Sequence, residues 1–196
     1  MLLYFFVLLF YGRSCCFCAE QKGNDHRLPP VESGDLVFRN GTGQWSRYFR
    51  DVSLREKRFS HAGIIRVETN AAFVIHASAD DRTGAGFVHQ EPLHSFINPY
   101  DDVAIYRVTD AAKSDREQIA VFAVKNLGKL FDAQFDLTSG ERYYCTELIR
   151  DAVAFALKTN MIKTTAVSGY EIIAIDDCYA GDWVFLIYDS RAATVP

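Results

Sequence analysis

Short apolar runs separated by turn residues dominate the chain between residues 34 and 108. Apolar or alternating runs bounded by Gly, Asn, Asp or Pro predict β-strands. His61–Glu68 and residues 72–78 flank the turn Thr69-Asn70, so these two runs predict a β-hairpin. Strands are expected at residues 34–39, 61–68, 72–78, 86–90 and 103–108.

Two later segments have the periodicity of amphipathic helices instead. Residues 114–130 open with Ser114-x-x-Glu117, a capping box, and continue with apolar side chains at helical spacing. A second helix is expected from about Tyr143 to Leu157, and shorter helices at residues 44–52 and 92–97. An aromatic-rich run at residues 182–189 predicts a last, central strand. The sum is an α+β fold, with a mostly antiparallel sheet and helices packed on it.

The N-terminus differs from the rest of the chain. Residues 2–10 are entirely apolar and precede small and then polar residues, which is typical of a secretory signal. The run is shorter than the roughly 20 residues that span a bilayer. We therefore predict a signal peptide or uncleaved anchor at residues 1–19, a linker at 20–33 and one domain at 34–190. The expected location is outside the cytoplasm: periplasmic, secreted, or anchored in the membrane by the N-terminus.

Composition narrows the class of partner. The chain is 49% apolar with 15 Phe and 10 Tyr, so it can bury a substantial core. Its net charge is -4, and no Lys/Arg cluster forms a nucleic-acid footprint. Composition therefore gives no indication of a nucleic-acid partner.

The cysteines leave two interpretations open. Three of the five, Cys15, Cys16 and Cys18, lie in the predicted leader, so Cys145 and Cys178 belong to the domain. In an exported protein these two form a disulfide in one interpretation. In the other, Cys145 is a free nucleophile, and a bridged sulfur would exclude that role.

Cys145 is expected close to the start of the second helix, where Thr138 and Ser139 supply plausible capping upstream. A thiol in the first turn feels the positive end of the helix dipole, which lowers its pKa toward thiolate. Cys145 also continues the apolar stripe of its own helix, so a buried inert thiol is the competing interpretation.

His61 and His76 lie on the two strands of the predicted hairpin, and its turn brings them to the same end of the ladder. One imidazole is then a general base for Cys145, and the other orients it. A zinc site made by His61, His76 and Cys145 is an alternative, although the usual short ligand spacings are absent.

Several segments appear in an order that resembles a known family: Gly34-Asp35-Leu36-Val37, Phe59-Ser60-His61-Ala62-Gly63-Ile64-Ile65, Phe73-Val74-Ile75-His76-Ala77, Leu130-Phe131-Asp132-Ala133-Gln134-Phe135 and Tyr144-Cys145-Thr146-Glu147-Leu148. Over residues 32–189 the chain is similar to the circularly permuted papain-like cysteine amidases of the YaeF/YiiX type. These are relatives of bacterial cell-wall amidases and of lecithin–retinol acyltransferase.

The resemblance implies a permuted papain-like fold with the nucleophile at a helix N-terminus. It implies Cys145 as nucleophile, His61 as general base and His76 as the third catalytic residue. Tyr144 is expected to add a hydroxyl donor near the oxyanion, and Asp35 to help line the substrate site. No metal or organic cofactor is implied. Glu147 is expected to be structural, paired with Arg142 or Arg150.

Three functions follow from the resemblance and from the two cysteines of the domain, and the expected partner is a small-molecule, peptide or lipid-like acyl substrate. The first is a thiol hydrolase that cleaves an amide or peptide bond, on cell-wall peptides or N-acylated amino acids. The second is a lipid acyl hydrolase or acyltransferase that uses the same Cys-His site, with an acyl groove along residues 87–96. The third is a non-catalytic binding domain held by a Cys145–Cys178 disulfide.

Overall fold

The computed structural model describes residues 28–41 and 43–192. The predicted leader at residues 1–19, with its three cysteines, and the first part of the predicted linker lie outside the described residues. None of the described helices is both long and apolar enough to span a membrane.

The strands are β1 (Leu36–Arg39), β2 (His61–Glu68), β3 (Ala71–Ala79), β4 (Gly86–Pro92), β5 (Val103–Val108), β6 (Leu130–Phe131), β7 (Arg142–Tyr143), β8 (Thr165–Val167), β9 (Tyr170–Ile172) and β10 (Val184–Asp189). The helices are α1 (Gln44–Val52), α2 (Leu93–Ile97), α3 (Lys113–Lys125), α4 (Cys145–Leu157) and the short 3₁₀ helix η1 (Ile175–Cys178).

One sheet organises the molecule. Its strand order is β10-β5-β1-β2-β3-β4-β6-β7, and β8 and β9 form a separate hairpin. Neighbouring strands in this sheet are antiparallel except β6 and β7. The expected strands and the hairpin across residues 69–70 are confirmed. The last strand was expected to be central, but β10 pairs only with β5 and lies at the edge, where Phe185 and Leu186 remain exposed.

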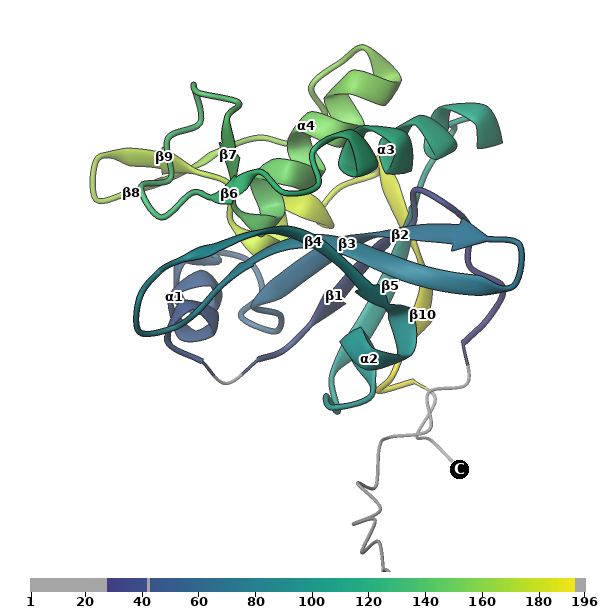
Figure 1. The fold of residues 1–196 in the computed structure, drawn as a ribbon, viewed down its shortest axis with the longest axis horizontal. Coiled ribbons are helices and arrows are strands. Elements are labelled where there is room, and N and C mark those ends of the chain that lie inside the picture. The colour runs from purple at the N-terminus through teal and green to yellow at the C-terminus, as the bar shows by residue number, and fades with distance from the viewer. Residues whose placement is uncertain (1–27, 42, 193–196) are drawn as a thin grey trace, which may run out of the picture.

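Helices cover both faces of the sheet (Figure 1). α3 and α4 pack on one face, over β2 and β3, and a large apolar core separates them from the strands. The short helix α2 packs on the opposite face against β3 and β4, where Phe96 belongs to a second, smaller core. The alternation of side chains along each strand supplies both cores, because successive residues point to opposite faces. The expected α+β architecture is thus confirmed.

Helix boundaries differ from the prediction in two places. α3 begins at Lys113 after Ala112, with no side-chain cap, so the Ser114 capping box does not form. The helix ends five residues earlier than expected, since Asn126 turns its amide onto the carbonyl of Phe122 and Gly128 adopts a left-handed φ of 84°. α4 begins at Cys145 rather than Tyr143, because residues 142–143 pair with β6.

Candidate active site

Cys145 is the first residue of α4, directly after Tyr144 in an extended conformation. No side chain caps this helix, so Thr138 and Ser139 do not play the expected capping role. Instead Thr146 anchors the first turn, its hydroxyl donating to the carbonyl of Ile173 at 2.7 Å. The sequence prediction of a cysteine at a helix N-terminus is confirmed, and the open end leaves backbone N–H groups facing the thiol.

The thiol is buried, with 1% of Cys145 exposed. Burial raises the pKa of Cys145 to about 11, although backbone N–H groups, that of Ala62 first, and the charge of Arg39 act in the opposite direction. The expected shift toward thiolate is therefore wrong for this resting state, because removal from water outweighs the helix N-terminus. A neutral thiol that loses its proton during attack fits this environment better than a pre-formed thiolate.

His61 and His76 meet as the hairpin predicted. Nε2 of His61 lies 2.8 Å from Nδ1 of His76, with the two rings perpendicular. Gly63 leaves room for this contact, because a Cβ there would lie 3.2 Å from the Cβ of His76 and 2.3 Å from Val74. Burial lowers the pKa of His61 well below its usual value and that of His76 to about 4, so both rings are neutral at pH 7.

Glu91 extends this pair into a chain of three. Its Oε1 lies 2.9 Å from Nε2 of His76. That hydrogen bond lowers the pKa of Glu91, so the carboxylate is ionised. A carboxylate only accepts, which places a proton on Nε2 of His76 and leaves its Nδ1 as an acceptor. Nε2 of His61 must then donate to that acceptor, and Nδ1 of His61 keeps its lone pair. The chain thus fixes His61 in the tautomer that a general base requires.

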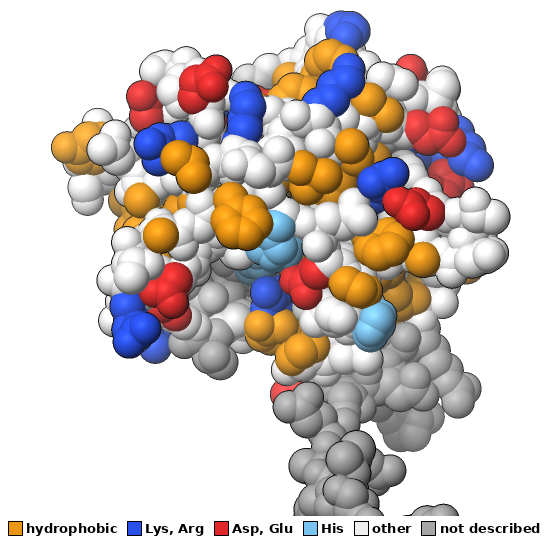
Figure 2. Space-filling model, viewed as in Figure 1, with side chains coloured by type: hydrophobic (Ala, Val, Ile, Leu, Met, Phe, Trp, Pro, Cys, Tyr) orange, Lys and Arg blue, Asp and Glu red, His pale blue; other side chains and the backbone are white. Residues whose placement is uncertain are grey.

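The sequence prediction missed Glu91. It ended the strand at Gln90 because Pro92 resembles a helix start, whereas β4 continues through Pro92. His89 is opposite His76 in the β3–β4 register, and Glu91 is two residues further on the same face. Glu91 and His89 are partly exposed. Figure 2 shows a histidine beside an acidic and a basic side chain near the middle of the face in view.

Cys145 and His61 line one cavity of about 340 Å³. Its apolar wall includes Trp45, Phe49 and Phe131, and Arg39 supplies a cation. Arg39 is opposite His61 in the β1–β2 register, so the two side chains are neighbours. The sequence contained no signal for Arg39 beyond its place at the end of a strand. The cavity thus brings a thiol, an imidazole and a guanidinium together.

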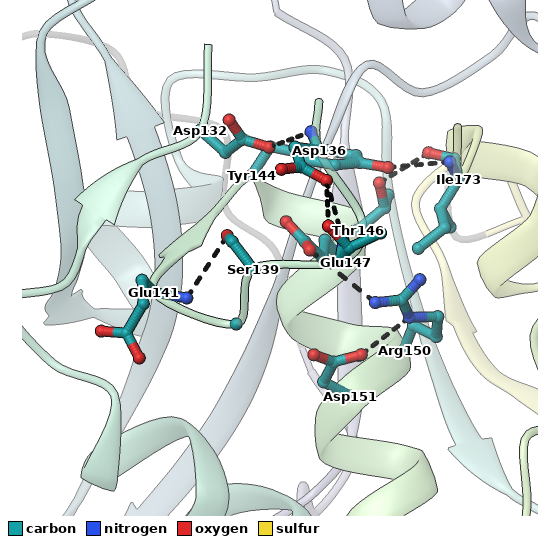
Figure 3. Close-up of polar contacts among 12 residues, drawn as sticks. Asp132, Asp136, Ser139, Glu141, Tyr144, Thr146, Glu147, Arg150, Asp151 and Ile173 are labelled. Carbon is teal, nitrogen blue, oxygen red and sulfur yellow. Dashed lines mark hydrogen bonds and ion pairs between the residues drawn. The ribbon is translucent and has the colours of Figure 1, made fainter. Parts of the chain in front are cut away.

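Tyr144 and Asp35 lie elsewhere. The hydroxyl of Tyr144 accepts the backbone N–H of Ile173 at 2.8 Å, as Figure 3 shows. Asp35 is fully buried at the start of β1, where both of its oxygens accept from Arg107 at 2.7 and 2.8 Å. Neither side chain lines the cavity of Cys145. Both residues hold the fold in place, and the substrate-contacting roles expected for them have no support in this geometry.

Glu147 is buried on α4, and its nearest basic partner is Arg150 at 3.7 Å (Figure 3). The predicted structural pairing with Arg150 is confirmed. Burial raises the pKa of Glu147 to about 8 despite that neighbour.

The disulfide interpretation is wrong. Cys145 and Cys178 are both buried free thiols, and the sulfur of Cys178 lies 3.9 Å from the carbonyl oxygen of Thr146 instead. The non-catalytic domain held by that bridge loses its basis.

Metal ligands group differently from the zinc hypothesis. Among the described residues, His76, His89 and Glu91 bring their ligand atoms within 4.8 Å of one another, whereas the trio of His61, His76 and Cys145 does not. His76 and Glu91 also form the hydrogen bond that orients His61. A cation bound by His76, His89 and Glu91 would therefore compete with the hydrogen bonds that link Glu91, His76 and His61.

Comparison with known proteins identifies the fold and the family. A search of curated proteins found no match. Among solved structures, the metalloprotein YiiX from Escherichia coli O157:H7 is similar, with a TM-score of 0.67 and 16% sequence identity over 81% of this chain and 97% of that one. At this identity the likeness shows the fold alone. Residues 30–175 match the model of a family described as permuted papain-like amidase enzyme, YaeF/YiiX, C92 family. The chain belongs to this permuted papain-like amidase family and is a hydrolase.

Proposed function

We propose that this enzyme cleaves an amide bond of a peptide or N-acylated amino acid, with Cys145 as nucleophile and His61 as general base. One observation carries the proposal: His61 lines the same cavity as Cys145, and the Glu91–His76–His61 hydrogen bonds leave Nδ1 of His61 unprotonated. A nucleophile, a base and an orienting group are the minimum set for acyl transfer by a thiol.

The reaction proceeds in two halves. Sγ of Cys145 attacks the carbonyl carbon while Nδ1 of His61 takes the thiol proton. The C–N bond then breaks, His61-H⁺ passes that proton to the leaving nitrogen, and a thioester remains on Cys145. Water attacks the thioester, and His61 takes a proton from the water. The C–S bond breaks, the acid leaves, and the proton returns to the Cys145 sulfur.

Backbone groups are suited to the developing oxyanion. The N–H of Cys145 is the first of α4 and has no intrahelical acceptor. Such a donor stabilises negative charge on the carbonyl oxygen during attack.

The cavity favours an amide substrate over a long fatty-acyl lipid. An acyl group fits against the aromatic wall of Trp45, Phe49 and Phe131, but the charge of Arg39 is costly to cover with hydrocarbon. The groove expected along residues 87–96 does not support the lipid alternative either, since Phe96 is buried beneath the histidine rings while Phe87 is exposed to solvent.

The test is to trap the acyl-enzyme. The full chain is mixed with a panel of peptide amides, N-acyl amino acids and fatty-acyl esters, quenched in acid and weighed by mass spectrometry. We expect an acyl adduct on Cys145 with the amides, none in Cys145→Ala, and formation slowed about 10²–10⁴-fold in His61→Gln. Cys178→Ser is the matched control, because it removes the other buried thiol.

Two outcomes would contradict the proposal. An adduct that persists in Cys145→Ala excludes this nucleophile. Adducts formed from fatty-acyl esters but from no amide would favour the lipid acyl hydrolase instead.

A further inference from the structure

Arg39 makes no close ion pair with a described residue, and the charge of Glu91 acts on it only from a longer distance. Arg39 projects from the end of β1, opposite His61, and lines the cavity that contains Cys145. No carboxylate oxygen of a described residue lies within the 4.0 Å ion-pair distance of its guanidinium. A charge removed from water without a partner is unfavourable, so such a group in a substrate cavity points to a missing anion.

Two aromatic rings hold the guanidinium. Its central carbon lies 4.5 Å from the ring centre of Phe96 and 3.9 Å from that of Tyr100. Its Nε is buried with no hydrogen-bond partner. Stacking on aromatic rings uses the flat face of a guanidinium and leaves its edge to hydrogen-bond an anion.

Two carboxylates, Asp80 and Asp81, line the same cavity, and each accepts a hydrogen bond from the backbone. Oδ1 of Asp80 accepts the backbone N–H groups of Arg82 and Thr83, and Oδ1 of Asp81 accepts that of Trp45. Glu91 hydrogen-bonds His76. None of these described carboxylates therefore forms an ion pair with Arg39.

We propose that Arg39 forms a carboxylate-binding subsite beside Cys145, so that the preferred substrates carry a free carboxylate close to the scissile amide. The inference rests on the proposed function and narrows its substrate class. An N-acylated amino acid or a peptide cleaved at its C-terminal residue has this arrangement, with the carboxylate one carbon away from the amide nitrogen. A guanidinium can bind such a group through two parallel hydrogen bonds.

Carboxylate binding also favours the chemistry. The charge of Arg39 is among the causes that lower the pKa of His61. A bound carboxylate offsets that charge, which makes His61 a better proton acceptor when substrate is present.

Two small alkylating reagents test the subsite directly. Iodoacetate carries a carboxylate one carbon from its reacting group, and iodoacetamide is its neutral isostere. Peptide mass spectrometry measures the rate at which each reagent modifies Cys145 in the full chain. The rate with iodoacetate is divided by the rate with iodoacetamide. This rate ratio is then divided by the same rate ratio measured for glutathione. The ratio cancels changes in thiolate fraction, which affect both reagents equally.

We expect the normalised ratio of the wild type to be about tenfold above one, and this increase to be lost in Arg39→Gln. Arg39→Lys should keep part of it, because lysine retains the charge but cannot form two parallel hydrogen bonds with a carboxylate. Arg82→Gln is the matched control, because it removes one positive charge from the exposed β3–β4 turn. A wild-type ratio equal to that of glutathione, or an equal loss in Arg82→Gln and Arg39→Gln, overturns the subsite.

A binding measurement separates failure of the subsite from failure of the proposed reaction. Calorimetry on the Cys145→Ala protein compares N-acetylalanine with its amide, which requires no reactive thiol. Tighter binding of the acid that disappears in Cys145→Ala/Arg39→Gln supports the subsite even if Cys145 proves unreactive. Equal binding of acid and amide contradicts the subsite and leaves the hydrolase proposal standing.

Discussion

Nε2 of His76 lies 2.9 Å from Oε1 of Glu91 on the neighbouring strand. This contact makes His76 an intermediary rather than an end member of the site, since its other nitrogen bonds His61. The carboxylate at the far end decides which nitrogen of each ring carries the proton. Loss of that charge should therefore change the chemistry at Cys145, although Glu91 does not line its cavity.

Glu91→Gln should lower kcat/KM about 10–100-fold, because an amide can donate as well as accept and no longer selects one tautomer of His76. The measurement is steady-state kinetics across pH on the amide substrate found by acyl-enzyme trapping. His89→Gln on the same strand is the control and should stay within about threefold of wild type. Equal losses in both variants would mean that Glu91 acts only through general packing.

The alkylation rate of Cys145 should keep rising to a higher pH than the rate of an ordinary thiol does. Burial raises its pKa to about 11, so the thiolate is a minor species at neutral pH and its fraction grows with each pH unit. Iodoacetamide labelling should therefore keep accelerating above the free-thiol pKa of about 8.5. Rates measured from about pH 5 to 10 check this. A plateau below about pH 7 would show a stable thiolate–imidazolium pair instead.

Tyr144→Phe should destabilise the protein without slowing the reaction. The hydroxyl accepts the N–H of Ile173 in a fully buried position, and its loss leaves that donor unpaired, at a cost of about 1–3 kcal/mol. Urea unfolding measures the loss, with Tyr170→Phe as an exposed control. If Tyr144→Phe slowed acylation tenfold or more (about 1.4 kcal/mol) in folded protein, the hydroxyl would be serving the oxyanion after all.

Glu147 should make the protein less stable as pH rises. Its pKa is raised from 4.5 to about 8 in the folded chain, so the unfolded chain releases the proton first. The stabilising contribution is complete below pH 4.5 and is lost as pH rises through 8. The total loss is on the order of a few kcal/mol.

Glu147→Gln removes that titration, so its free energy of unfolding should exceed the wild-type value near pH 8 and approach it near pH 5. Urea unfolding at both pH values measures the difference. Glu141→Gln, an exposed residue nearby, should leave the pH dependence unchanged. A Glu147→Gln protein with the wild-type pH dependence would show that Arg150 keeps this carboxylate ionised.

Local patterns in the sequence determined the helices and strands and brought His61 and His76 together. The alternation over residues 61–68 and 72–78 identified the hairpin that joins His61 to His76, and the helix expected from about Tyr143 placed Cys145 in a first helical turn. These inferences succeed because side-chain periodicity and helix initiation depend on neighbouring residues along the chain. The helix caps at Ser114, Thr138 and Ser139 failed, since tertiary pairing set those boundaries instead.

Only the tertiary structure decided what surrounds His61 and His76. Strand register brings Glu91 and Arg39 beside these two histidines. Register relates residues that are distant in the sequence, so a prediction that misplaces one strand end loses it. The protonation states of Cys145 and His61 follow from burial, which no local pattern contains. The sequence by itself therefore determined which groups are the candidates for the reaction, and the packing of strands and helices decided their charge, their orientation and the cation beside them.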